Sequence, residues 1–381
     1  MTTTINNEHK KLNVPNLRFP EFQGEWKRTI FKNVITLQRG SSPRPIIEYV
    51  TTSDDGVNWI KIGDMPHFGR IVTSTEEKIT KEGAKKSRQV NKGDLILSNS
   101  MSYGLPYIMG IDGYIHDGWF VLKNFENTFD KDYLCNLLIS SAIQNQYKRL
   151  AAGGVVQNIS SDLVNSVSVS IPTMMEQKKI SSLLNLIDER IATQNKIIDK
   201  LQSLIKGIAQ KIVRSNKPNV RLYECVECSS STQQESEVCE QGAYPVYGAN
   251  GIVGYLDDYN TEGEAVYIIK DGSGVGTVSY VTGKCSATGT LNTLQAKDGY
   301  SLQYLYYLLK VFNFEPYKTG MAIPHIYFKD YGKAKVFCPS YTEQLQYARL
   351  LSAIDSKLSV EKNTLRNLSL QKQYLLRQMF I

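Results

Sequence analysis

A segment of eighteen residues recurs in this chain as two similar copies. It reads "IPTMMEQKKISSLLNLID" at residues 171–188 and "CPSYTEQLQYARLLSAID" at residues 338–355, so the copies lie 167 positions apart. Many residues are identical at that offset, among them Ile159 and Ile326, Pro172 and Pro339, Glu176 and Glu343, Gln177 and Gln344, Leu183 and Leu350, Leu184 and Leu351, Ile187 and Ile354, Asp188 and Asp355. Matches this dense on one diagonal indicate a tandem duplication, and hence a fold of two similar halves.

Each copy of the repeat predicts the start of a long helix. Pro172-Thr173-x-x-Glu176 and Pro339-Ser340-x-x-Glu343 follow the capping-box pattern. Residues then recur at alternating steps of four and three, the spacing of a coiled-coil seam. The seams are Ile180, Leu184, Ile187, Ile191, Gln194, Ile198, Leu201, Ile205, Ile208, Ile212 and Tyr347, Leu351, Ile354, Leu358, Glu361, Leu365, Leu368, Lys372, Leu375, Met379. Two helices that pack on each other are expected, although two amphipathic helices buried in separate domains would share this pattern.

A globular segment of short strands, turns and shorter helices precedes each long helix. The two segments resemble each other weakly, and the offset changes to 192 where Val34 pairs with Val226, so the second segment is about 25 residues shorter. The extra length falls within residues 41–90. We therefore expect an α+β protein with a pseudo-twofold repeat, in which two similar mixed α/β domains are separated by two long helices packed as an antiparallel coiled coil. The predicted segments are a flexible tail (1–16), a first domain (17–172), a central helix (173–216), a second domain (217–339) and a second helix (340–381).

The repeat also suggests a geometry. Two tandem units related by a twofold axis perpendicular to their helices place those helices antiparallel, with one globule at each end. Residues 180–212 form a rod of about 50 Å at 1.5 Å per residue. Half-sites on B-DNA lie roughly 34–36 Å apart per helical turn. Such a rod could hold two heads on one duplex, and helix length would act as a ruler.

Composition is consistent with a nucleic-acid partner but does not require one. The 381 residues exceed one typical core. Lys and Arg number 44 against 37 Asp and Glu, a modest excess that suits a polyanion. The sequence has no long apolar run and a polar N-terminus, so we expect a cytoplasmic protein. Cys225 and Cys228 form a CxxC without a second pair, which favours incidental thiols over a zinc site.

Catalytic motifs fail on inspection. "TGKCS" at 282–286 lacks the glycine and hydroxyl residue of a phosphate loop, and "GSGVG" at 272–276 lies between strand-like runs rather than before a helix. No Pro-Pro pair supports an amino-methyltransferase motif, and the four histidines have no metal-ligand spacing. The sequence predicts a protein without catalytic activity, with no cofactor or metal of its own.

The two P-[ST]-x-x-E-Q helix starts and the loop around "GSGVG" resemble the DNA specificity subunit of type I restriction-modification systems, over nearly the whole chain from about Pro15. The resemblance implies two target recognition domains that each read one half of a bipartite, asymmetric DNA target. It implies helices that set the spacer and dock two modification (methyltransferase) subunits, with restriction (motor-nuclease) subunits recruited to the complex. S-adenosylmethionine, ATP and Mg would then bind to those partners.

Candidate DNA contacts lie in loops rich in serine, asparagine and glycine. Arginine can donate two hydrogen bonds to guanine, and hydroxyl groups suit phosphate oxygens. The candidates are Arg39, Ser41, Ser42, Arg44, Asn99, Ser100 and Tyr103 in the first domain, and Tyr247, Asn250, Lys270, Ser273 and Thr277 in the second. The same residue types are common in solvated turns.

Two alternatives to DNA recognition stay open at this point. One is a coiled-coil scaffold that presents two ligand-binding heads without nucleic acid, and the other is an enzyme with an unfamiliar active site. Affinity for duplex DNA that falls steeply with salt would favour the DNA-binding hypothesis over the scaffold.

Overall fold

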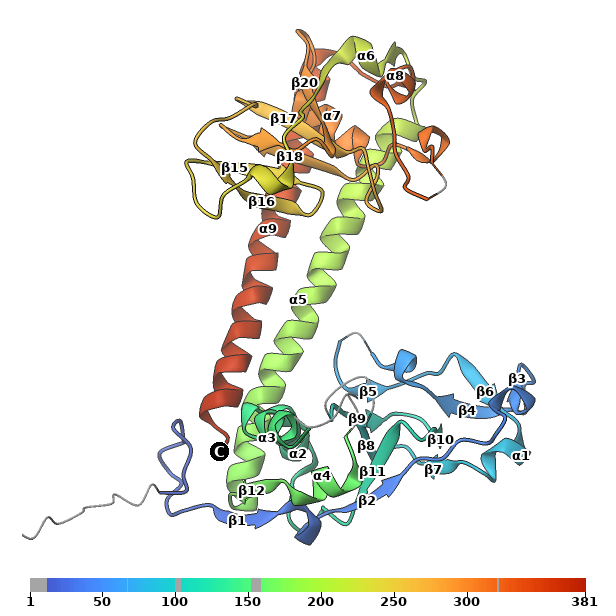
Figure 1. Ribbon diagram of the computed structural model, residues 1–381, viewed down its shortest axis with the longest axis vertical. Coiled ribbons are helices and arrows are strands. Elements are labelled where there is room, and N and C mark those ends of the chain that lie inside the picture. Colours follow the sequence, from blue (N-terminus) through green and yellow to red (C-terminus); the bar gives the residue numbers. More distant parts are fainter. Residues whose placement is uncertain (1–11, 67, 100–103, 152–158, 321) are drawn as a thin grey trace, which may run out of the picture. The chain divides into compact units, whose positions relative to one another are not determined.

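The computed structural model describes residues 12–381 except 67, 100–103, 152–158 and 321 (Figure 1). The chain forms two compact units. The first unit contains the residues up to Asn195 together with Thr364–Ile381, and the second unit contains Lys196–Asn363. The border between the units passes through both long helices, so each unit holds one part of each helix.

The two long helices are α5 (Met174–Arg214) and α9 (Tyr341–Gln378). Every residue of the two predicted seams is buried or half-buried. Inside the first unit, Asp188 of α5 pairs with Lys372 of α9, while Ile180 and Met379 lie in one core. Early residues of α5 therefore accompany late residues of α9, and the helices run antiparallel. This confirms the predicted pairing and excludes separate burial.

The two helix starts use their shared glutamate differently. At α9, the Glu343 carboxylate accepts a hydrogen bond from the Ser340 backbone N–H at 3.1 Å, and Ser340 Oγ accepts one from the Glu343 N–H at 3.4 Å, which is the predicted capping box. At α5, the Glu176 carboxylate instead binds the Arg18 guanidinium at 2.7 and 2.8 Å, and the Trp26 indole N–H at 3.3 Å. Half of the predicted capping box is present at α5, because Thr173 Oγ1 accepts a hydrogen bond from the Glu176 N–H at 3.4 Å. The other half is wrong, because the half-buried Arg18 binds the Glu176 carboxylate.

The glutamine that follows has the same role in both copies. Gln177 Oε1 accepts a hydrogen bond from the Asp130 backbone N–H at 2.9 Å, and Gln344 Oε1 accepts one from the Ser301 N–H at 2.9 Å. Each amide N–H₂ donates to the carbonyl of the proline five residues earlier, at 3.1 and 2.9 Å. Asp130 and Ser301 are the N-caps of α2 (Lys131–Ile139) and α7 (Leu302–Leu309). The repeated glutamine thus fixes one short helix of each unit to a long helix.

Strands also pair at the base of each unit. In the first unit β1 (Lys27–Ile30) pairs antiparallel with β12 (Ser168–Ile171), and in the second β13 (Val220–Arg221) pairs antiparallel with β21 (Lys335–Val336). The second strand of each pair leads directly into a long helix. The same two-stranded base therefore closes both globular segments, as a duplication predicts.

The first unit adds two five-stranded sheets. One has the order β3 (Val50–Thr51), β6 (Glu77–Ile79), β4 (Val57–Ile60), β10 (Gly113–Ile115), β7 (Arg88–Val90). The other has the order β2 (Thr36–Arg39), β11 (Trp119–Lys123), β8 (Leu95–Ser98), β9 (Pro106–Met109), β5 (Ile71–Val72). The helical elements are α1 (Lys81–Ala84), α2, α3 (Ser141–Ala151), α4 (Ser161–Ser166), η1 (Phe31–Asn33), η2 (Ile46–Glu48) and η3 (Ile62–Asp64). The first of these sheets lies within the region predicted to hold the extra length, 41–90, together with β10.

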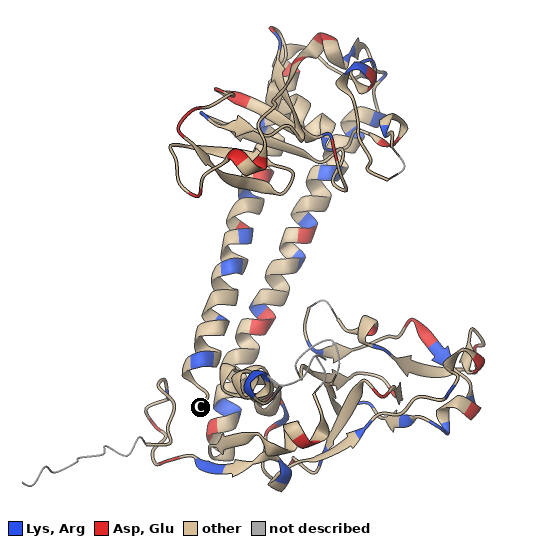
Figure 2. Cartoon of the chain, viewed as in Figure 1, with Lys and Arg blue, Asp and Glu red and all other residues tan. Residues whose placement is uncertain are grey.

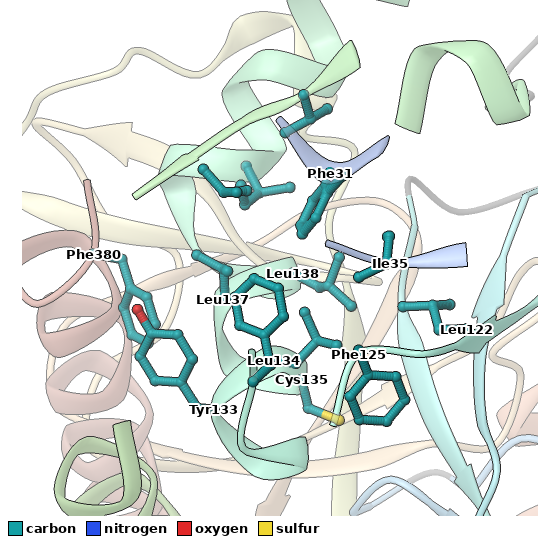
Figure 3. Close-up of a cluster of buried hydrophobic side chains, with 14 of the residues drawn as sticks. Phe31, Ile35, Leu122, Phe125, Tyr133, Leu134, Cys135, Leu137, Leu138 and Phe380 are labelled. Carbon is teal, nitrogen blue, oxygen red and sulfur yellow. The ribbon is translucent and has the colours of Figure 1, made fainter. Parts of the chain in front are cut away.

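The main core of the first unit joins the globular segment to both long helices (Figure 3). The ring of Tyr133 in α2 packs against Phe380 in a tilted arrangement, with ring centroids 5.3 Å apart. Leu134, Leu137 and Leu138 are fully buried beside them. Residues 364–381 thus belong to the first unit, and Leu375, Leu376, Met379 and Phe380 enter its core, although they follow the second unit in sequence.

The second unit is smaller. Its sheets have the orders β14 (Val226–Ser230), β20 (Leu291–Ala296), β17 (Glu264–Ile269), β18 (Val278–Thr282) and β16 (Gly251–Leu256), β15 (Tyr244–Gly248), β19 (Ser286–Ala287). Its short helices are α6 (Leu222–Cys225), α7, α8 (Phe328–Tyr331), η4 (Glu235–Glu237) and η5 (Glu315–Tyr317). Mixed sheets and helices in both units confirm the predicted fold class.

The CxxC cysteines do not act together. Cys225 Sγ lies 3.7 Å from Cys338 Sγ in the buried base of the second unit, and Cys228 lies on β14. In the described part of the chain, no three His, Cys, Asp or Glu side chains gather as metal ligands. Among the described helices, none is both long and apolar enough to cross a lipid bilayer.

We expect Gln344→Ala to lower the free energy of unfolding by about 1–3 kcal/mol, because it leaves the buried Ser301 N–H and Pro339 carbonyl without their partner. Urea denaturation followed by circular dichroism measures this change. Gln346→Ala, at an exposed position of the same helix, is the matched control and should change stability by less than about 0.5 kcal/mol. Equal effects of the two substitutions would contradict the assigned role of Gln344.

Candidate nucleic-acid interface

Four of the predicted DNA contacts in the first unit bind one aspartate. Asp117 lies between β10 and β11, and its carboxylate accepts a hydrogen bond from Ser42 Oγ at 2.8 Å and pairs with Arg44 Nη2 at 3.2 Å. Its backbone carbonyl accepts hydrogen bonds from Asn99 Nδ2 at 2.9 Å and from Arg39 Nε at 3.3 Å. The structure therefore brings residues of three chain segments together at one point.

The loop after β2, which begins at Arg39 and contains Ser42 and Arg44, packs with its backbone against the turn that carries Asp117. The Gly40 N–H donates to the Trp119 carbonyl at 2.8 Å, and the Ser41 N–H donates to the Ile115 carbonyl at 3.3 Å. A Cβ atom added at Gly40 would stand 1.9 Å from the His116 carbonyl oxygen. Only glycine permits this close approach, so the loop that starts at Arg39 has a fixed path.

The polar groups here divide into exposed and buried ones. The side chain of Arg44 is 81% exposed, and Arg39 is also exposed, so both guanidinium groups reach solvent. Asn99 is buried, and its backbone N–H donates to the Gly118 carbonyl at 3.0 Å. The arginines can therefore meet a ligand directly, whereas Asn99 holds the turn beneath them.

Two neighbouring titratable groups are perturbed. The hydrogen bond from Ser42 lowers the pKa of the Asp117 carboxyl below its usual value, while burial acts in the opposite direction. Burial lowers the pKa of His116, and the nearby Asp117 carboxylate opposes that shift. At neutral pH the site therefore presents an ionised Asp117 beside a neutral His116.

In the second unit, Lys270 occupies the place of Asn99. The Lys270 N–H donates to the Thr290 carbonyl at 2.9 Å, and its carbonyl accepts from the Ile326 N–H at 2.9 Å. The Asn99 carbonyl accepts in the same way from Ile159, the repeat partner of Ile326, at 2.8 Å. Shared contacts with repeated residues show that these two loops correspond.

The loop after Lys270 is a glycine-rich connection between β17 and β18, which pair antiparallel. Gly272 and Gly276 have φ angles of 95° and 89°, a conformation that favours glycine. Ser273 and Thr277 are exposed on this loop. The expected glycine-rich hairpin is confirmed, and its hydroxyl groups face solvent.

Tyr247 and Asn250 belong to the neighbouring β15–β16 hairpin. The Tyr247 ring packs against Tyr267 of β17, with centroids 5.6 Å apart, while Asn250 is exposed at the turn. Burial raises the pKa of the half-buried Tyr247 hydroxyl, so it stays protonated at neutral pH. Ser100 and Tyr103 lie outside the described residues. Contact of any predicted residue with DNA stays a prediction.

Sequence reasoning missed Asp117. A carboxylate is not expected in a surface that meets phosphate, and Asp117 stands 75 positions after Ser42, so spacing gives no signal. The contact of Asp117 with Ser42 and Arg44 can be identified only from the structure, in which β10 and β11 place Asp117 beside the loop after β2.

Positive charge is concentrated on the long helices (Figure 2). Together α5 and α9 carry 14 Lys and Arg against 7 Asp and Glu, while residues 217–339 carry 10 against 13. The helices therefore hold an excess equal to that of the whole chain, and the globular part of the second unit is acidic overall. If residues 217–339 bind a polyanion, the affinity has to come from individual basic and hydroxyl side chains at the binding site, because the net charge of this part is negative.

We expect the Asp117 carboxyl to titrate below 3.8, the usual value for aspartate, when followed by NMR. Ser42→Ala should move its pKa upward, because the hydroxyl stabilises the ionised form. The stabilisation that this carboxylate gives the loop is therefore present above the usual pKa and lost as the pH falls through the lowered one. Ser41→Ala, one residue earlier, is the control. A pKa unchanged by Ser42→Ala would show that this hydrogen bond does not hold the carboxylate.

Two regions of the chain match one known protein family. Residues 24–203 and 219–369 match the family described as type I restriction modification DNA specificity domain. The specificity subunit of the type I restriction enzyme EcoprrI from Escherichia coli is 20% identical over 350 residues, which cover 85% of this chain and 86% of that protein. A putative type I specificity subunit from Mycoplasma genitalium is 26% identical over 261 residues, covering 62% of this chain and 68% of the relative.

The fold is also found among solved structures. The crystal structure of the S subunit of a type I restriction-modification system from M. genitalium has a TM-score of 0.63 and 18% identity, covering 97% of this chain and 99% of that one. A chain from a structure of type I complex assembly and conformational transition has a TM-score of 0.56 and 16% identity, covering 92% and 96%. At these identities the likeness concerns the fold alone.

Proposed function

The chain belongs to the family of type I restriction modification DNA specificity domains, and we propose that it is the subunit that recognises the DNA target in such a complex. The observation that carries this proposal is the pair of matches to one DNA specificity domain, at residues 24–203 and 219–369. Two such domains in one chain suit a bipartite target, of which each domain reads one half.

The contrast between the two reading loops supports an asymmetric target. The first unit offers two exposed guanidinium groups braced by Asp117. The second offers Lys270 and the exposed hydroxyl groups of Ser273 and Thr277 on a glycine-rich loop. Different donor sets at corresponding places recognise different base edges, since each base pair presents its own pattern in the major groove.

The paired helices are the shared element of this proposal. Their antiparallel seam would set the spacer between the half-targets, and their outer surface would dock two modification subunits, with restriction subunits joining the complex. In this proposal the chain has no catalytic activity and acts in the cytoplasm. Methyl transfer, cleavage, and the binding of S-adenosylmethionine, ATP and Mg belong to the partners. A scaffold without nucleic acid is disfavoured, because both matched regions are DNA specificity domains.

Exchanging residues 17–172 for the corresponding domain of a relative should change one half of the methylated sequence and leave the other half unchanged. Each unit has its own core and its own loop, which is the physical basis for independent reading. Methylation mapping in cells that carry the chimeric complex measures both halves at once. The reciprocal exchange of 217–339 is the control. A change in both halves after a single exchange would contradict independent reading.

Inserting seven residues into the middle of both α5 and α9 should widen the spacer. Seven helical residues add about 10.5 Å, close to three base-pair steps, and a whole heptad preserves the seam. The same mapping reads the spacer length. Insertion into α5 alone is the control, and it should abolish recognition because the seam loses its register. A spacer that stays fixed while both half-targets are still recognised would rule out the ruler.

A further inference from the structure

A basic hollow lies inside the second unit, between α7 and the two long helices. It has a volume of about 360 Å³, and three lysines line it: Lys206 of α5, Lys310 at the end of α7, and Lys362 of α9. Three separate elements thus contribute one ammonium group each to the same hollow. All three lysines are exposed, so an external ligand can reach them.

These ammonium groups are not neutralised by carboxylates. Within the described residues, none of the three lysines takes part in an ion pair, and Lys310 Nζ instead lies 5.0 Å from the centre of the Tyr306 ring. Asp355 also lines the hollow, and its carboxylate accepts a hydrogen bond from the Tyr307 hydroxyl at 3.4 Å. Three cations and one anion leave a net positive charge, and a concave wall focuses its field outward.

The first unit has the corresponding hollow, but there the charges are paired. Asp188 lines that hollow of about 310 Å³ as its repeat partner Asp355 lines the other. Arg70 Nη2 lies 2.9 Å from the Asp188 carboxylate, and Lys372 also pairs with it. At the 167-residue offset, Lys362 and Lys206 correspond to Asn195 and Gln373. Lys310 corresponds to Ile139, because each stands nine residues after the N-cap of its short helix, Ser301 or Asp130. The free cations are therefore a property of the second unit and not of the duplicated fold.

A short segment of chain, residues 310–314, connects the hollow to the reading loop of the second unit. Phe314 follows Lys310 by four residues, and a Cβ atom added at Gly276 would stand 3.0 Å from the Phe314 ring. Gly276 belongs to the loop that carries Ser273 and Thr277. Lys310 is therefore only four residues from a side chain that contacts this loop.

We propose that Lys206, Lys310 and Lys362 bind backbone phosphates of the DNA spacer next to the second half-target. This inference rests on the proposed function. Lysine neutralises phosphate as a point charge and carries no base information, which suits a segment whose sequence is not read. Residues 217–339 carry more Asp and Glu than Lys and Arg, so the three lysines form a locally positive site beside a globular part that is acidic overall. These phosphate contacts would raise the affinity for DNA without changing which target sequence is preferred.

The test compares three triple variants in the complex with the modification subunits. Lys206→Gln, Lys310→Gln and Lys362→Gln together should reduce the slope of log affinity against log salt by about 2 to 3, since each phosphate contact contributes about 0.9. The preference for the mapped target over a scrambled duplex should stay unchanged. Replacing the same three lysines by arginine should preserve the slope. The matched control removes three exposed lysines at the base of the unit: Lys217→Gln, Lys333→Gln and Lys335→Gln.

Three results would overturn the proposal. The slope could stay unchanged, the control could reduce it equally, or the variant could bind DNA normally while its complex with the modification subunits weakens, which would assign the hollow to an acidic protein surface. Failure of the proposed function looks different, because the wild-type complex would then show no preference for its own target. The salt slope of its non-specific binding would still test the hollow.

Discussion

The antiparallel seam between α5 and α9 is the constraint on which the rest of the structure depends. Each unit uses one part of each helix, so its core is complete only when the two helices pair. In the first unit, Phe380 from the segment after α9 packs on Tyr133 of α2. Apolar burial at such contacts is the main favourable term in folding. Any partner or DNA that acts on one helix therefore also acts on the core of a globular unit.

Two neighbouring residues of the repeat differ in how well the two copies keep their contacts. Gln177 and Gln344 bridge the same backbone groups in both units. The preceding glutamates have diverged, because Arg18 and Trp26 bind Glu176 while Ser340 binds Glu343. The join tolerates little change because an unpaired buried amide is costly, whereas a helix cap can be replaced by an ion pair.

The sequence was sufficient to predict the elements with a strong period. The repeat and its four-three spacing predicted two helices, their antiparallel pairing and two mixed α/β domains, because apolar periodicity and local capping chemistry act over short distances. It was not sufficient for the site. Asp117 comes close to Ser42 only through sheet pairing. In the basic hollow, Lys310 comes 104 residues after Lys206, and Lys362 another 52 residues later. Long-range proximity of polar side chains leaves no periodic signal.

The path of the chain through the first unit has a kinetic consequence. Residues 364–381 belong to this unit, but a ribosome adds them only after residues 196–363 have been made. Translation proceeds at roughly 5–20 residues per second, so the nascent first unit waits about 10 to 30 seconds with one wall of its core open to water. During that interval the apolar side of α5 is a surface for chaperones, or for the same segment of another nascent chain on a neighbouring ribosome.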